Sequence, residues 1–199
     1  MIHFTVPGRP SRWMRPGQDI DSHGRVFRFT DKRAEAGKKE ICRHARRAFG
    51  LRRPFLCPVI IRVVAIYAIP PSWPDAVKRA AREGTLLHMQ DPDLDQLVKQ
   101  AMDAIKGVAY LDDNQVAGFS NCAKRYGEPE RTEITIQPMP APVPTPGQRR
   151  LEKKVEEMGW EAAIALALNP PRRKANPSNT NIPAGIRNRA RGRKGPGRG

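Results

Sequence analysis

The sequence predicts an α+β fold in which a mixed or antiparallel sheet packs against two or three helices. The apolar, β-branched run "CPVIIRVVAIYAIPP", at residues 57–71, is long enough for a central strand and ends at two prolines. Shorter segments near the start of the chain and in "NQVAGFSNCAKRY" and "TEITIQP" are typical of further strands. Other segments have apolar residues at helical spacing. These elements complete a core at about residue 138.

The N-terminal segment pairs a strand signal with a basic loop. "MIHFTVPG" alternates apolar and polar residues and stops at a Pro-Gly turn, as a half-buried strand does. The next segment, "RPSRWMRPGQ", is loop-like and places Arg9, Arg12 and Arg15 around Trp13. A short strand is expected at residues 26–29. We expect the three arginines to contact nucleic-acid phosphates; the alternative is ordinary solvated loop charge.

Two helices and a hairpin are expected around the central strand. Residues 31–49 form a helical run with Thr30 or Asp31 as the N-cap and Gly50 as the stop. "SWPDAVKRAAREG" predicts a short helix capped by Ser72, with a proline near its first turn. "NQVAGFSNCAKRY" and "TEITIQP" are expected to be two antiparallel strands joined by the turn "GEPE".

The composition changes after the expected core. Residues 138–147 are a Pro-rich linker that should be extended and semi-rigid. Residues 148–169 have apolar positions at helical spacing and predict an amphipathic helix. Residues 170–199 contain no acid and many cations among Gly, Pro and Asn, so a disordered basic tail is expected. It is interpreted as a nonspecific nucleic-acid arm, with a plain solvated tail as the alternative.

The charge of the chain points to a polyanionic partner. The chain has 36 Lys and Arg against 20 Asp and Glu, a net charge of +16. Nucleic acid is the first candidate and a membrane surface the second, but no apolar run reaches the roughly 18 residues of a membrane span. We found no signal peptide and expect a cytoplasmic protein. Cys42, Cys57 and Cys122 lack CxxC spacing, which predicts free thiols rather than a disulfide framework or a zinc site.

A third helix is expected where the chain gathers acids, in "DPDLDQLVKQAMDAIKG". Because proline is tolerated only in the first helical turn, Pro92 predicts that the helix begins near Asp91, and Gly107 ends it. The carboxylates of Asp91 and Asp93 would then lie at the positive end of the helix. Asp91 is interpreted as a cap.

Further acids share one face of this helix. Asp95, Lys99 and Asp103 are spaced i, i+4, i+8, and Asp112 and Asp113 follow just before the next strand. Carboxylates this close repel one another, and a divalent cation removes the conflict. Mg²⁺ prefers oxygen ligands and takes waters and substrate phosphate as well, so the pattern favours phosphodiester hydrolysis. The bland alternative is a set of capping acids plus an ion pair between Asp95 and Lys99.

The same residues carry a resemblance to a known family. "DPDLDQLVKQAMDAIKGVAYLDDNQV" resembles the signature of the RusA-type Holliday junction resolvases, and "FTVPGRPSRWMRP" followed by "FTDKR" is similar to the opening of that family. The resemblance covers about residues 2–137. It implies a RusA-like endonuclease domain over residues 1–137, forming a homodimer that nicks four-way DNA junctions symmetrically and leaves 5′-phosphate and 3′-hydroxyl ends. It also implies Mg²⁺ as the cofactor, with Mn²⁺ as a substitute.

The resemblance assigns roles to individual residues. Its essential acids correspond to Asp93, Asp95 and Asp113, which would hold Mg²⁺, and its essential lysine corresponds to Lys99. Asp103 matches a further recurrent position and is expected to be supporting. Gln96 stands where the family usually has Asn, and its extra methylene could shift a hydrogen bond behind the metal ligands.

Two other classes of function were weighed. A DxD phosphatase or nucleotide-sugar transferase places its acids at the end of an apolar strand, whereas these acids open a helix. A catalytically silent nucleic-acid-binding protein would use the basic tail and keep the acids for structure. His88 lies beside the acids and is expected to be a surface loop residue.

Overall fold

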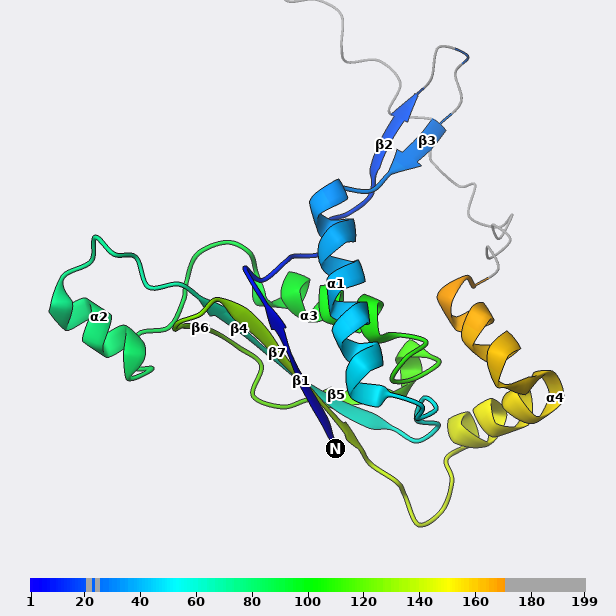
Figure 1. The fold of residues 1–199 in the computed structure, drawn as a ribbon. Helices are drawn as coiled ribbons and strands as arrows, with labels where there is room; N and C mark the ends of the chain where they lie inside the picture. Colours follow the sequence, from blue (N-terminus) through cyan, green and yellow to red (C-terminus); the bar gives the residue numbers. More distant parts are fainter. Residues whose placement is uncertain (21–22, 24–25, 171–199) are drawn as a thin grey trace, which may run out of the picture.

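The computed structural model describes residues 1–20, 23 and 26–170 (Figure 1). The elements in order are β1 (Ile2–Pro7), β2 (Gly17–Ile20), β3 (Val26–Phe29), α1 (Lys32–Phe49), β4 (Val59–Tyr67), α2 (Asp75–Arg82), α3 (Leu94–Ile105), the short 3-10 helix η1 (Asp113–Gln115), β5 (Val116–Phe119), β6 (Ala123–Tyr126), β7 (Arg131–Pro138) and α4 (Pro146–Leu168). The predicted α+β class is confirmed. The predicted tail from residue 171 onward lies outside the described residues.

The main sheet is mixed and has the order β1, β7, β4, β5, with β6 also paired to β4. β7 runs antiparallel to both β1 and β4. β5 and β6 run parallel to β4, β5 beside its first residues and β6 beside its last ones. The expected hairpin between β6 and β7 is therefore wrong, because β4 lies between them. β4 pairs with β7 on one side and with β5 and β6 on the other, and its nearly continuous burial is typical of a central strand covered on both faces.

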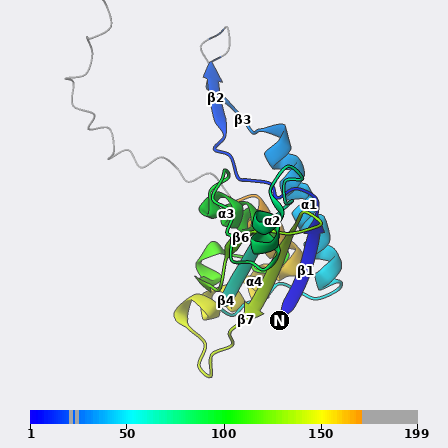
Figure 2. The ribbon, with the colours of Figure 1, turned by 90° about the vertical axis from the view of Figure 1, so that its left-hand side faces the viewer.

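Helices α1 and α3 cover one face of the sheet and pack against each other. The core combines Ile41 and Phe49 of α1 with Ile105 of α3 and with Ile61 and Ile134 of the sheet. β2 and β3 form a separate two-stranded ribbon that projects beyond the start of α1 and stands clear of the sheet in both views (Figures 1 and 2). The strand at residues 26–29 was expected; its partner β2 falls partly in the segment predicted as a loop.

Helix starts differ from the prediction at two places. Asp31 caps α1 as predicted, since its carboxylate accepts from the backbone N–H groups of Arg33 and Ala34. For α2 the N-cap is Pro74, and the predicted cap Ser72 lies outside the helix.

Helix α3 begins at Leu94 with Asp93 as N-cap, three residues after the predicted start at Asp91. Pro92 precedes the helix instead of lying in its first turn. Asp93 has an extended backbone, with φ −66° and ψ 149°, so helical geometry starts only after it.

The C-terminal helix α4 packs back on the core at the end of the sheet opposite α2 (Figure 1). Val155, Ala163 and Ala167 form a buried cluster with Leu111, the residue just before the Asp112–Asp113 pair. The helix was predicted over 148–169, but this packing surface was not. Among the described residues, no helix is long and apolar enough to cross a membrane.

Candidate active site

Four of the predicted site residues line one hollow of about 680 Å³ between α3 and the β5–β6 edge of the sheet. Asp95, Lys99 and Asp103 come from successive turns of α3, and Asp113 comes from η1. The remaining wall is apolar and consists of Leu94, Val98, Met102, Phe119 and Cys122. The acids at helical spacing on α3 and the later acid Asp113 thus line the same hollow.

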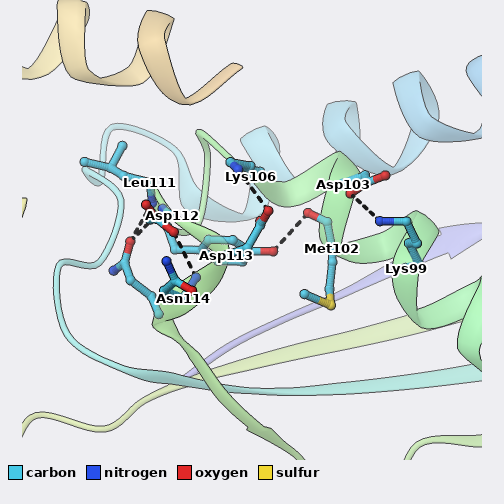
Figure 3. A network of polar contacts seen from close by, with 10 residues as sticks. Lys99, Met102, Asp103, Lys106, Leu111, Asp112, Asp113 and Asn114 are labelled. Atoms are coloured by element: carbon cyan, nitrogen blue, oxygen red, sulfur yellow. Dashed lines mark hydrogen bonds and ion pairs between the residues drawn. The ribbon is translucent and has the colours of Figure 1, made fainter. Parts of the chain in front are cut away.

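Lys99 and Asp103 form an ion pair on the wall of this hollow, with Nζ 3.6 Å from Oδ1 (Figure 3). The alternative pairing of Lys99 with Asp95 is not seen among the described residues; Lys99 turns one helical turn onward instead. The Lys99 side chain is 50 % exposed, and exposed pairs contribute little to stability. Breaking the Lys99–Asp103 pair therefore costs little free energy.

Asp112 and Asp113 are adjacent but have different tasks. Asp112 caps η1, since its carboxylate accepts from the backbone N–H of Asn114 at 2.9 Å. Asp113 points toward α3, where Lys106 Nζ lies 3.0 Å from its Oδ2 (Figure 3). Only Asp113 belongs to the lining of the hollow that holds the α3 acids.

Buried polar groups hold residues 111–115, here called the Asp113 segment, in place. Gln115 is buried and accepts from the N–H groups of Leu111 and Asp112 at 2.8 and 2.9 Å. It donates to the carbonyl oxygens of Phe55 and Cys57 at 2.8 and 3.2 Å.

Tyr110 ties the same segment to α3. Its hydroxyl donates to the Met102 carbonyl at 3.0 Å. Burial, followed by the charges of Asp113 and Asp103, raises the pKa of Tyr110, so it remains a neutral donor. The sequence did not identify Tyr110 or Lys106 as parts of the site. Gln115 belongs to the motif "LDDNQV", but its role in holding this segment was not predicted.

The basic N-terminal loop docks on the start of α3. Arg12 forms an ion pair with Asp91, and the backbone N–H of Trp13 donates to the Gln96 carbonyl at 3.1 Å. Asp91 therefore holds the loop and does not cap the helix as predicted. Arg9 and Arg15 are exposed, as a phosphate contact requires.

The three acids predicted to hold a metal are not gathered into one cluster. Asp93 is exposed at the start of α3 and is not part of the hollow's lining, whereas Asp95 and Asp113 are. Within residues 1–20, 23 and 26–170, no group of three or more His, Cys, Asp or Glu side chains is close enough to hold a metal ion.

His88 is buried, not exposed as predicted, with 6 % of its surface accessible. Its ring stacks on Tyr67, with the centroids 4.0 Å apart, and also contacts Tyr126. Burial lowers the pKa of His88, and the charges of Lys124 and Arg9 lower it further. The ring is thus a neutral part of the packing beneath the start of α3.

Comparison with known proteins decides the family. The sequence model of the family described as "Endodeoxyribonuclease RusA" matches residues 7–137. The chain belongs to the RusA family. The predicted resemblance to RusA-type Holliday junction resolvases is thereby confirmed, and an endodeoxyribonuclease activity follows at the level of the family.

A curated relative is similar over most of its length. The "Uncharacterized protein YqaN" of Bacillus subtilis (strain 168) is 30 % identical over 145 residues, which cover 70 % of this chain and 98 % of the relative. The RusA match includes the basic loop, α3 and η1 but ends before α4. Helix α4 is therefore an addition that packs on the RusA core next to the Asp113 segment.

Proposed function

We propose that this protein is a Mg²⁺-dependent endonuclease that resolves four-way DNA junctions by paired, symmetric nicks during recombination and repair. The observation that carries the proposal is the hollow in which Asp95, Asp103, Asp113 and Lys99 meet in a member of the RusA family. Paired nicks need two such hollows, so we propose a homodimer. The products would carry 5′-phosphate and 3′-hydroxyl ends.

The donor set of the hollow fits Mg²⁺. This ion is usually held by one or two carboxylates and completes its shell with water and phosphate oxygens, so a cluster of three acids is not required. Asp95 and Asp113 offer carboxylates from two different elements to the same hollow, and Asp93 is the N-cap of the helix that carries Asp95. When bound, the ion would activate water and stabilise charge on the phosphate; Mn²⁺ could replace it.

The protein's own cations supply the rest of the chemistry. Lys99 is paired with Asp103, and Lys106 is paired with Asp113. We propose that Lys99 moves from Asp103 to a phosphate oxygen, where it stabilises the charge that develops during hydrolysis. Asp103 would keep Lys99 in reach between turnovers, which is the supporting role expected of it.

DNA binding would rest on exposed cations around the site. Arg9 and Arg15 are free of ion pairs among the described residues and lie on the loop that docks on α3. Arg12, being paired with Asp91, would orient the loop more than contact phosphate. We also propose that the basic tail of residues 171–199 adds nonspecific affinity for DNA.

A second candidate is the catalytically silent DNA-binding protein. It is favoured by the absence of a three-acid cluster among the described residues and by the pairing of Asp103 and Asp113 with lysines. It predicts junction binding without cutting under any divalent cation.

A junction-cleavage assay separates the two candidates. Purified protein with Mg²⁺ should cut a synthetic four-way junction by paired nicks near the crossover, and Asp95→Asn should bind the junction without cutting it. Asp75→Asn is the matched control, because Asp75 is an almost fully exposed acid at the start of α2, away from the hollow. Binding without cutting by the wild type, in both Mg²⁺ and Mn²⁺, would establish the silent binder.

A further inference from the structure

The ring of Trp13 lies beneath the ammonium group of Lys99. Lys99 Nζ is 5.0 Å from the centroid of the indole, within the range of a cation–π contact. The same ammonium is 3.6 Å from Asp103. Lys99 is thus held between an aromatic face supplied by the N-terminal loop and an acid of its own helix.

Two contacts place the loop that carries this ring, and an exposed ion pair beside them adds little. The Trp13 N–H donates to the Gln96 carbonyl at 3.1 Å, and the neighbouring Arg12 pairs with Asp91. On the other side, the Ser11 side chain sits so closely on Gly37 of α1 that any Cβ at Gly37 would overlap it. Trp13 is therefore placed by both α1 and α3 and is not a free surface side chain.

A lysine side chain has four rotatable bonds, and half of the Lys99 side chain is exposed to water. Asp103 alone restrains it weakly, because exposed ion pairs are worth little. The fixed ring face adds a second attraction for the ammonium group. Because the ring carries no negative charge, it does not repel a phosphate that approaches the same ammonium group. When Lys99 leaves Asp103 for a phosphate, the ring can stay in contact with the ammonium.

We propose that Trp13 is a positioning residue for Lys99, holding the ammonium at the rim of the hollow where the scissile phosphate would lie. This inference rests on the proposed function, because it assumes that Lys99 acts on phosphate. The contact at Gln96 uses the backbone carbonyl of that residue, so the docking of the loop does not depend on which side chain stands there.

The test uses Trp13→Phe and Trp13→Leu. Phenylalanine keeps an aromatic face, whereas leucine keeps apolar bulk without the π system. At saturating junction, kcat should fall about two-fold for Trp13→Phe and about five- to tenfold for Trp13→Leu, while the Kd for the junction without divalent cation stays within about two-fold. In a Lys99→Ala background, Trp13→Leu should add no further loss, because the ring acts through Lys99.

A spectroscopic readout tests the contact without any cleavage. In the wild type, the ε-methylene protons of Lys99 should resonate upfield because they are next to the ammonium group that lies over the indole, and Trp13→Leu should return them to the usual position. Equal kcat losses for the phenylalanine and leucine variants would overturn the proposal in favour of simple packing. A loss confined to Kd would overturn it in favour of a direct DNA contact. If the wild type never cuts, the proposed function fails together with this role, while the proton shift still reports whether the contact exists.

Discussion

Replacing Gln115 by methionine should destabilise the protein through lost hydrogen bonds alone. Methionine has nearly the same length and leaves little cavity, but it can neither accept from the N–H groups of Leu111 and Asp112 nor donate to the carbonyls of Phe55 and Cys57. Gln115 is 6 % exposed, so water cannot freely replace these partners. Gln115 thus links the segment that carries Asp113 to the residues before β4 through buried hydrogen bonds.

The expected cost follows from the number of bonds. A typical hydrogen bond contributes about 1 kcal/mol net, and a buried group left without a partner costs about 1–3 kcal/mol. At about 1 kcal/mol each, the four bonds of Gln115 predict a loss of at least about 4 kcal/mol in the free energy of unfolding. Domains of this kind have a total stability of roughly 5–15 kcal/mol, so the variant should still fold at low temperature.

Urea unfolding followed by circular dichroism measures this loss. Gln137→Met is the control, because Gln137 is exposed on β7 and its variant should stay within about 0.5 kcal/mol of the wild type. If the two variants differ by less than about 1 kcal/mol, the hydrogen bonds of Gln115 do not hold the Asp113 segment as argued.

Two further predictions concern pH and salt. Since the pKa of His88 in the folded state is below its ordinary value of 6.5, the unfolded state binds a proton that the folded state does not. The free energy of unfolding should fall as the pH drops below about 6.5, and His88→Phe should reduce this dependence in urea midpoints at pH 5 and 7.5, whereas the exposed His3→Gln should not. Removal of residues 171–199, which carry nine Lys and Arg and no acid, should weaken junction binding and flatten its salt dependence without changing the cutting rate of bound junction. An unchanged slope of log Kd against log salt would make the tail a bystander.

Local signals in the sequence predicted the elements whose ends are set locally. The cap at Asp31 and the stop at Gly50 were both confirmed, because each acts on the backbone within a few residues. The pairing of strands was less predictable. "GEPE" suggested a hairpin, but the neighbour of β6 is β4, more than fifty residues earlier in the chain. The order of strands in the sheet depends on which strand lies in the centre and pairs at both edges. A local turn motif does not encode this order.

The residues of the site also differ in how far the sequence predicted them. Helical spacing alone placed Asp95, Lys99 and Asp103 on one face, and they line one hollow. Residues that hold this arrangement come from far away in the chain: Gln115 bonds to Phe55 across 60 positions. Nothing in the sequence around Gln115 identifies that partner, because the contact exists only after the sheet has formed. The role of each acid in metal binding stays a prediction.

The pairing of acids with lysines changes the electrostatic argument for a metal. In the sequence, the mutual repulsion of the carboxylates favoured a divalent cation. In the fold, Lys99 and Lys106 already neutralise Asp103 and Asp113, and among the described residues Asp95 is the acid of the hollow without an ion pair. The hollow thus holds one acid without an ion pair among the described residues, Asp95, beside two acids that are paired with lysines. We propose that a cation and a phosphate bind this site together, because the phosphate would take up the lysines while the cation takes the acids that they release. Metal affinity should therefore be weak for the protein alone and strong only with DNA bound.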